Sequence, residues 1–282
     1  MHPVLKLVRF GNTVVSFIGA VVAGFAAYGH GLAVPIATLA AIGAAGLSTA
    51  CVTAGGNVLN DLGDVESDRT NHPTRPLVTG AITVVGARRL AIALLVVAAV
   101  AIAPFSLALP LLPVFLAVAL LVLFAYEFRF KARGLPGNLL VATLTALVFV
   151  YGGIAGADVL VVLPLALMAL FATFSREVIK DIEDMAGDVD RRTYPQTHGV
   201  PAATRLARVS VALALLLSPV PLLLTVPLVS AAGIIYVVLV AAADVLFLVS
   251  VAWLPNRVHQ EQTVSKGAMA IALAAFLALA FR

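Results

Sequence analysis

The sequence is poor in charge. Only 11% of its 282 residues are Asp, Glu, Lys or Arg, whereas about a quarter of the residues in a soluble domain are charged. The hydrophobic fraction is 62% and the mean hydropathy is +1.08. This composition excludes an ordinary soluble domain. It predicts an all-α, polytopic membrane protein that forms one membrane-embedded domain over residues 1–282.

Cysteine is almost absent. The single cysteine, Cys51, lies inside an apolar stretch. One cysteine excludes an intramolecular disulfide, so cysteine usage says nothing about the redox compartment. The thiol is expected to contribute to packing only.

Apolar stretches long enough to cross a bilayer recur along the chain, since a membrane-spanning helix needs roughly 20 apolar residues. Counting on this basis predicts nine transmembrane helices. They are Val14–Ala33, Val34–Gly56, Arg88–Ala108, Pro110–Phe128, Asn138–Ala157, Val159–Glu177, Arg205–Val226, Ser230–Trp253 and Val264–Phe281. The longer connections between them are polar and short uncharged turns join the rest.

The lysines and arginines gather on one side of this topology. With nine spans and a cytoplasmic N-terminus, 17 of the 18 lie on the cytoplasmic side and only Arg282 lies outside. The positive-inside rule therefore predicts a multi-pass protein of the cell (plasma) membrane whose active face is cytoplasmic. Topology also explains the isoelectric point near 9.5, so no nucleic-acid partner is expected.

Acidic residues are scarce, and six of the 14 stand in two groups with identical spacing. The groups, with offsets of zero, three and seven, are Asp61, Asp64 and Asp68 and, 120 residues later, Asp181, Asp184 and Asp188. The recurrence favours an internal duplication. Four predicted spans separate the groups, so halves at about 14–128 and 138–253 would run in parallel, with a ninth helix at 264–281 outside the repeat.

The spacing of each group predicts a cation site. On a continuous helix these offsets lie along one face, and carboxylates so close together repel unless a cation lies between them. Mg²⁺ suits such a site because it binds a few carboxylates and completes its shell with water and phosphate oxygens. The implied ligand is therefore a polyphosphate held at the cytoplasmic face.

Neutral oxygens and cations near the two groups could contact that polyphosphate. Asn57 and Asn60 offer amide oxygens. Basic side chains clamp phosphate charge. The basic candidates are Arg75, Arg129, Lys131, Lys180, Arg191 and Arg192.

Some of these residues also have a simpler structural interpretation. The two aspartate groups could lie in acidic loops that solvate the membrane surface, although such loops have no reason to repeat one spacing. Tyr126 suits a membrane interface as well as an active site. Asp244, inside the eighth span, is either functional or hydrogen-bonded to a neighbouring helix. For the pair Gly152 and Gly153, close helix packing is the expected role.

The runs NDLGDVESD, followed by RPL, and DIEDMAGD resemble the two aspartate-rich motifs of the UbiA superfamily of intramembrane prenyltransferases. The resemblance covers nearly the whole chain. It implies nine helices in a UbiA-type arrangement around a central cavity, and Mg²⁺ that joins both motifs to the diphosphate of an allylic prenyl donor.

Carried onto this chain, the resemblance implies a metal site with oxygen ligands from both motifs. The metal-side residues are Asn60, Asp61, Asp64, Asp68, Asp181, Asp184 and Asp188. Tyr126, Arg129 and Lys131 match the residues that the superfamily uses around the donor diphosphate and the reacting carbon. The implied catalytic set is Asp64, Asp68, Asp184, Asp188, Tyr126 and Lys131.

Within that superfamily, SREVIKDIEDMAGD (Ser175–Asp188) is most similar to the archaeal digeranylgeranylglyceryl phosphate synthases. This implies a lipid-phosphate acceptor, geranylgeranylglyceryl phosphate, whose hydroxyl takes a geranylgeranyl group in archaeal ether-lipid biosynthesis. A prenyltransferase for an aromatic quinone precursor or a tetrapyrrole is the alternative within the class. A secondary transporter is the alternative outside it, but transporters place charged groups near the bilayer midplane.

Overall fold

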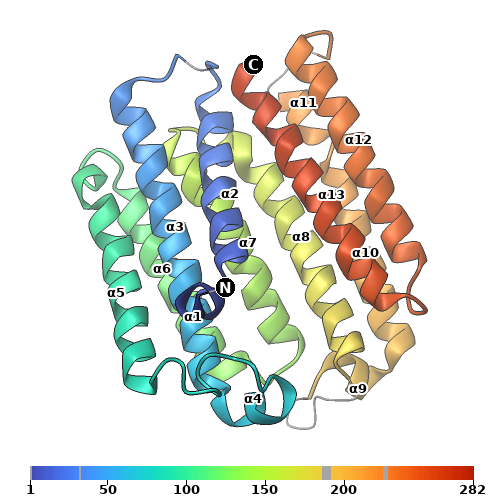
Figure 1. Cartoon of the computed structure of the whole chain (residues 1–282). Helices are drawn as coiled ribbons and strands as arrows, with labels where there is room; N and C mark the ends of the chain where they lie inside the picture. The colour runs from blue at the N-terminus through green and yellow to red at the C-terminus, as the bar shows by residue number, and fades with distance from the viewer. Residues whose placement is uncertain (1, 32, 186–191, 225–227) are drawn as a thin grey trace.

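The computed structural model describes residues 2–31, 33–185, 192–224 and 228–282. Within these ranges every regular element is a helix, and nine helices are long and apolar enough to cross a membrane. They lie side by side in one bundle (Figure 1). The predicted all-α fold with nine spans is therefore confirmed.

The spanning segments follow one another through short turns and small helices. In chain order the α-helices are α1 Pro3–Leu7, α2 Phe10–Tyr28, α3 Ile36–Gly63, α4 Val65–Asn71, α5 Val84–Ile102, α6 Leu111–Ala125, α7 Leu135–Ala155, α8 Val159–Glu183, α9 Tyr194–His198, α10 Val200–Leu217, α11 Val220–Leu224, α12 Ala231–Ala252 and α13 Val258–Ala278. The 3₁₀ turns Ala103–Phe105 and Leu279–Phe281 follow α5 and α13, and a π-helical turn, Tyr126–Phe130, follows α6.

Three of these helices are longer than hydropathy predicted. α3 reaches Gly63 instead of ending at Gly56, α8 reaches Glu183 instead of Glu177, and α13 begins at Val258 instead of Val264. Hydropathy locates the part of a helix that crosses hydrocarbon, whereas backbone hydrogen bonds continue into the polar zone until a cap ends them. The extra turns of α3 and α8 carry the first residues of the two aspartate groups.

The described residues of both aspartate groups lie at the same end of the bundle. The small helices α4 and α9, which follow α3 and α8, lie together at that end, and the C-terminus of the chain lies at the opposite end (Figure 1). There Arg282 donates a hydrogen bond to the Ala27 carbonyl and lies 3.7 Å from Asp158. This arrangement agrees with the predicted separation of Arg282 from the other cations.

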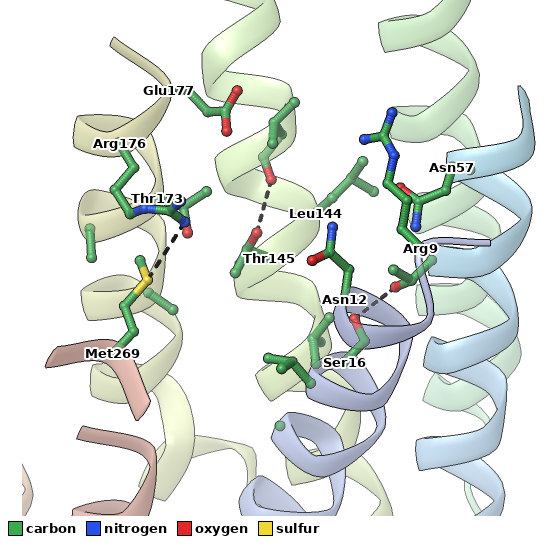
Figure 2. Close-up of a pocket in the computed structure, with 18 of the residues that line it drawn as sticks. Arg9, Asn12, Ser16, Asn57, Leu144, Thr145, Thr173, Arg176, Glu177 and Met269 are labelled. Atoms are coloured by element: carbon green, nitrogen blue, oxygen red, sulfur yellow. Dashed lines mark hydrogen bonds between the residues drawn. The ribbon is translucent and has the colours of Figure 1, made fainter. Parts of the chain in front are cut away.

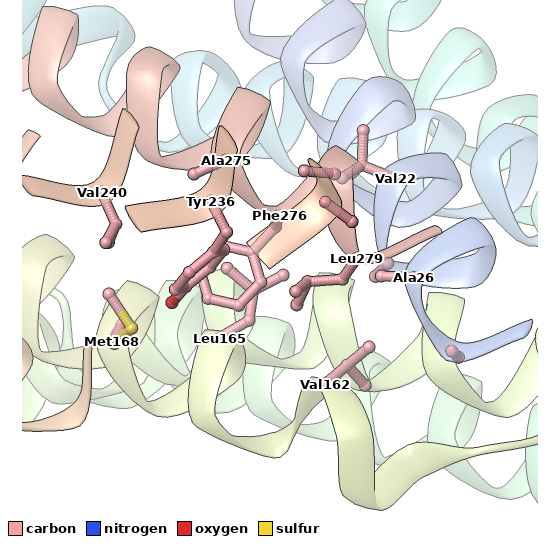
Figure 3. Packing of buried hydrophobic residues seen from close by; sticks show 14 residues of the cluster. Val22, Ala26, Val162, Leu165, Met168, Tyr236, Val240, Ala275, Phe276 and Leu279 are labelled. Atoms are coloured by element: carbon pink, nitrogen blue, oxygen red, sulfur yellow. The ribbon is translucent and has the colours of Figure 1, made fainter. Parts of the chain in front are cut away.

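A buried cluster joins α2, α8, α12 and α13. Tyr236 and Phe276 pack edge to face with ring centroids 5.5 Å apart, against Leu165 and Val22 (Figure 3). The Tyr236 hydroxyl donates to the Ser218 carbonyl at 2.7 Å. The Ser218 hydroxyl in turn donates a hydrogen bond to Asp244 at 2.7 Å. A hydrogen bond to a neighbouring segment is one of the two roles that the sequence left open for Asp244.

Glycines allow α2 and α7 to pack with their backbones close together. A Cβ atom on Gly152 would overlap the carbonyl oxygen of Ala20 on α2, and one on Gly153 would meet Val162 on α8. A glycine is required where two backbones approach this closely. The expected packing role of this glycine pair agrees with these contacts.

We expect Gly152→Ala to lower the thermal stability of the protein in detergent. The added methyl group meets a backbone atom that cannot rotate away, and overpacking of this kind costs about 1–3 kcal/mol. Gly43→Ala is the matched control, because a Cβ on Gly43 of α3 would meet no atom within 4 Å. An unchanged melting temperature for Gly152→Ala would contradict the close approach of α2 and α7.

Candidate active site

A large cavity lies inside the bundle. Its volume is about 1910 Å³, and its lining comes chiefly from α2, α3, α7, α8 and α13. Pockets for one small ligand usually measure about 300–1,000 Å³. The cavity therefore has room for two long-chain ligands. The lining is polar near the aspartate groups and includes apolar residues such as Phe149, Leu273 and Phe276 elsewhere.

The first aspartate group does not lie on one continuous helix. Asp61 belongs to α3, Asp64 is the residue at which α3 ends, and Asp68 belongs to α4. The expectation of a single helical face is therefore wrong, since the backbone of Asp64 turns to φ −101°, ψ 6° and redirects the chain. As a result Asp64 and Asp68 line the cavity, whereas the lining does not include Asp61.

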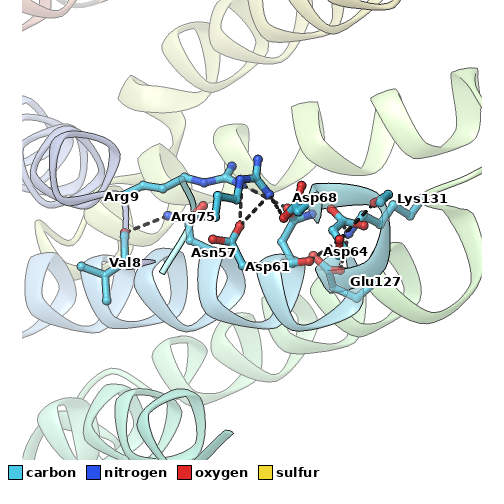
Figure 4. Close-up of polar contacts among 11 residues, drawn as sticks. Val8, Arg9, Asn57, Asp61, Asp64, Asp68, Arg75, Glu127 and Lys131 are labelled. Carbon is cyan, nitrogen blue, oxygen red and sulfur yellow. Dashed lines mark hydrogen bonds and ion pairs between the residues drawn. The ribbon is translucent and has the colours of Figure 1, made fainter. Parts of the chain in front are cut away.

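Asp61 is enclosed by two arginines. Its side chain is 4% exposed, and Oδ1 lies 3.0 Å from Arg9 Nη2 and 3.2 Å from Arg75 Nη1 (Figure 4). Arg9 also donates to Asn60 Oδ1 at 3.1 Å, and Arg75 forms an ion pair with Asp68. The negative charge of Asp61 is thus compensated within the protein. Arg75, expected to clamp phosphate, contacts these two carboxylates.

Arg9 lines the cavity, although from the sequence alone it is only one of the 17 cations predicted on the cytoplasmic side. It joins α1 to α2 with a left-handed backbone (φ 49°, ψ 63°), which is uncommon for a residue other than glycine and is found at functional sites. This conformation accompanies a side chain that reaches the end of α3 (Figure 4). Its partner Asp61 is 52 residues away, so no local sequence signal identifies the pair.

Lys131 connects the first aspartate group to the turn after α6. Its Nζ lies 2.8 Å from Asp64 Oδ2 and 3.4 Å from Glu127 Oε2, and it donates to the Asn60 carbonyl at 3.3 Å (Figure 4). Glu127, Lys131 and Tyr126 all line the cavity. Tyr126 and Glu127 open the π-helical turn, a feature that is frequent at functional sites.

Glu127 was not among the predicted site residues. Its spacing of four residues to Lys131 is a recognisable signal for an ion pair on a helix. The spacing did not reveal that the pair faces Asp64, because that depends on how α6 packs against α3.

The second aspartate group follows the first in its placement. Asp181 on α8 accepts a hydrogen bond from Asn138 Nδ2 at 2.8 Å, and Asp184 is the residue at which α8 ends. Asp64 and Asp184, which are 120 residues apart, thus both terminate a spanning helix, and each backbone N–H bonds the carbonyl four residues before it. This equivalence favours the predicted duplication. Asp188 and Arg191 lie outside the described residues.

Asp184 is a carboxylate at the C-terminus of a helix, whereas Asp64 both ends α3 and begins α4. The C-terminal end of a helix carries a partial negative charge, which repels a carboxylate placed there. Lys131 compensates Asp64 in this structure. A cation that bridges Asp64 and Asp184 would compensate both helix ends.

The cavity brings aspartates from both groups together. Asn60, Asp64 and Asp68 line it from the first group and Asp184 from the second. A small adjoining cleft of about 20 Å³ adds Asp181 and shares Tyr126, Lys131, Lys180 and Asp184 with the main cavity. Asn57 and Arg129 also line the main cavity, whereas the exposed Arg192 is absent from both linings.

The residues fit a magnesium ion that is shared with a phosphate ligand. Within the described ranges, no three acidic, histidine or cysteine side chains converge closely enough to hold a metal by themselves. Mg²⁺ does not require such a cage, because it is usually bound by one or two carboxylates together with water and substrate phosphates. Asp64, Asp68 and Asp184 offer hard oxygen donors from two sides of one cavity.

Together these features define a class of protein. A membrane-embedded helical bundle with acidic helix ends at one mouth of a large, partly apolar cavity suits a ligand with a phosphorylated head and an apolar chain. The chain belongs to the UbiA prenyltransferase family, which matches residues 16–280. It is therefore a multi-pass membrane prenyltransferase.

Relatives within this family share a specific name. The chain is 40% identical over 230 residues to the digeranylgeranylglyceryl phosphate synthase of Natronomonas pharaonis, covering 78% of this chain and 77% of the relative. It is 41% identical over 229 residues to the enzyme of the same name from Halobacterium salinarum, covering 79% and 78%.

Solved structures agree with the fold. A digeranylgeranylglyceryl phosphate synthase structure superposes with a TM-score of 0.78 at 31% identity, covering 99% of this chain and 98% of the other. A UbiA homolog from Archaeoglobus fulgidus, solved with geranyl diphosphate (GPP) and Mg²⁺, has a TM-score of 0.62 at 21% identity, with 97% and 99% covered. The second comparison supports the fold alone.

Proposed function

We propose that this protein transfers a geranylgeranyl group from geranylgeranyl diphosphate to the free hydroxyl of geranylgeranylglyceryl phosphate. The observation that carries the proposal is a single large cavity lined by Asp64, Asp68 and Asp184 from two separate helix ends. The relatives named digeranylgeranylglyceryl phosphate synthase support the choice of donor and acceptor. The positive-inside pattern supports a plasma-membrane enzyme with its active face towards the cytoplasm.

The reaction exchanges one carbon–oxygen bond for another. The acceptor hydroxyl oxygen bonds the allylic C1 of the donor, the bond from C1 to the diphosphate oxygen breaks, and diphosphate leaves with the electron pair. The hydroxyl proton is released. Charge develops mainly on the leaving diphosphate, so groups that stabilise that charge accelerate the step.

The chain supplies those groups from three directions. Asp64 and Asp68 on one side and Asp181 and Asp184 on the other would hold Mg²⁺, with Asp188 a further predicted ligand. Magnesium, when bound, supplies Lewis-acid stabilisation of the diphosphate oxygens. Lys131 places a positive charge beside Asp64, within reach of the same headgroup.

Asp61 is assigned a positioning role instead of the predicted metal contact. Its carboxylate holds Arg9 and Arg75, and Arg75 in turn holds Asp68. This chain of ion pairs fixes the orientation of Asp68 towards the cavity.

The apolar part of the cavity protects the reacting carbon. Cleavage of an allylic bond leaves positive charge on carbon, which water would capture. Leu144, Phe149 and Leu273 line the cavity away from the aspartates and provide a dry environment for the prenyl chain.

A substrate assay tests the proposal directly. Purified protein in detergent, supplied with Mg²⁺ and geranylgeranyl diphosphate, is expected to prenylate geranylgeranylglyceryl phosphate and to leave 4-hydroxybenzoate unmodified, as measured by mass spectrometry of the products. Prenylated 4-hydroxybenzoate with no lipid product would contradict the acceptor and favour the quinone-precursor alternative. Turnover in detergent, where no gradient exists, would also exclude an obligatory transport role.

A further inference from the structure

The wall of the cavity opposite the first aspartate group is formed by α8 and α13. Arg176 on α8 and Met269 on α13 lie on this wall, while Arg9 and Asn57 lie across the cavity (Figure 2). From the sequence alone, Arg176 is one of the 17 cations predicted on the cytoplasmic side. The proposed donor site does not use it.

α13 presents two kinds of side chain to the cavity in succession. Gln262, Thr263 and Lys266 line it near the start of the helix, and Met269, Leu273 and Phe276 line it further along. The spacing places all six along one helical face. Lys266 and Phe276 are separated by roughly 15 Å along the axis. This order matches a lipid with a polar head and a long apolar chain.

Arg176 is held in place by a neutral partner. Its Nη2 donates to Gln262 Oε1 at 3.1 Å, and Gln262 Nε2 donates back to the Arg176 carbonyl at 3.0 Å. Nη1 lies 3.9 Å from the Met269 sulfur, and the buried Nε has no hydrogen-bond partner. The guanidinium is therefore oriented by α13. The charges of Glu177 and of Glu261 on α13 attract it, but within the described residues neither carboxylate forms a direct ion pair with it.

The charge of Arg176 distinguishes it from the cations of the donor wall. Arg9, Arg75 and Lys131 each form an ion pair with an aspartate of the first group. Within the described part of the chain, neither Arg176 nor Lys266 forms an ion pair with any carboxylate. A guanidinium fixed in this way is well suited to a phosphate group, and Lys266, one turn beyond Gln262, adds a second positive charge.

We propose that Arg176, Gln262 and Lys266 form the binding site for the phosphate monoester of the acceptor lipid, whose chain lies along Met269, Leu273 and Phe276. The proposal rests on the proposed function and names the residues that recognise its acceptor. Two cations match the two negative charges of a phosphate monoester. The monoester would then lie about 12 Å along α8 from Asp184, which ends that helix. This separation limits its repulsion with the diphosphate and leaves the acceptor hydroxyl between them.

Steady-state kinetics with each substrate varied in turn tests the site. Arg176→Gln and Lys266→Gln are each expected to raise the KM for geranylgeranylglyceryl phosphate at least about tenfold while changing the KM for geranylgeranyl diphosphate less than about twofold. Arg205→Gln, which removes an exposed charge on α10 away from the cavity, is the matched control and is expected to change neither. Unchanged acceptor KM values in both variants would overturn the proposal.

A purely structural role for Arg176 gives a different result. Loss of its bonds to Gln262 would then lower the melting temperature and alter both KM values together. Lys266 is exposed, so Lys266→Gln tests the charge without disturbing the core. A raised acceptor KM for Lys266→Gln with an unchanged melting temperature supports the site.

A binding measurement without donor or Mg²⁺ separates this site from the proposed reaction. Dodecyl phosphate is expected to raise the melting temperature of the wild-type protein and to have a smaller effect on Arg176→Gln, whereas inorganic phosphate and dodecanol have little effect on either. Equal stabilisation of the two proteins by dodecyl phosphate would overturn the site. If dodecyl phosphate binds through Arg176 but no prenyl transfer occurs, the proposed function fails and the lipid-phosphate site remains.

Discussion

Asp64→Asn and Asp184→Asn are each expected to reduce prenyl transfer by on the order of 10³-fold, about 4 kcal/mol of transition-state stabilisation. Each substitution removes a charged oxygen donor from one side of the shared cavity. Because both carboxylates are proposed to hold the same magnesium–diphosphate head, the double variant should be little worse than either single one. Product formation at saturating Mg²⁺ and donor provides the measurement.

Glu66→Gln is the matched control for this prediction. Glu66 lies between Asp64 and Asp68 in the sequence, but its side chain is 83% exposed and pairs with Arg69 on the surface. It should retain near-normal turnover. The Asn variants should keep their melting temperature, since the loss is expected in catalysis and not in folding. Near-normal rates in Asp64→Asn or Asp184→Asn would rule out the proposed metal site.

The second large effect is expected for Lys131→Met, which should lower turnover by about 10²-fold. Lys131 is 13% exposed and sits between Asp64 and Glu127. Methionine keeps most of the length and apolar character of the side chain but removes the charge that would stabilise the leaving diphosphate. The KM for the donor should also rise.

The magnesium requirement distinguishes this role from a structural one. Without the ammonium group the site is more negative, so Mg²⁺ should bind at a lower concentration even though turnover falls. Initial rates over a range of Mg²⁺ concentrations measure both quantities. Lys6→Met, a change of the same kind at an exposed residue of α1, should alter neither. A Lys131→Met enzyme that needs more Mg²⁺ and has unchanged turnover would contradict the assignment.

Several parts of the fold follow from local sequence alone. Nine apolar stretches, interrupted by polar connections, were enough to predict nine spans, because the bilayer sets the length of every helix that crosses it. The distribution of lysine and arginine placed both aspartate groups at one end of the bundle. The repeated spacing of Asp64 and Asp184 within those groups indicated the position of the proposed site, since only eight of the 14 acidic residues occur elsewhere.

The local signals were less informative about helix ends. Hydropathy predicted that α3 ends at Gly56, whereas the helix continues to Gly63 and the Asp64 N–H still bonds the Asn60 carbonyl. The offsets of zero, three and seven suggested a single face only because the chain was assumed to remain helical. A cap or a break depends on what the end of a helix meets, and that lies outside its own sequence.

The sequence by itself therefore determined the membrane class, the number of spans and the end of the bundle at which the two aspartate groups begin, because hydrophobicity and charge act through the bilayer whatever the packing. The tertiary structure alone decided the role open to each charged side chain. Arg9 and Asp61 are 52 residues apart, and Arg176 and Gln262 are 86 residues apart. Whether a carboxylate is enclosed by arginines, or a guanidinium is left for a ligand, depends on which helices pack together, and no local pattern encodes that choice.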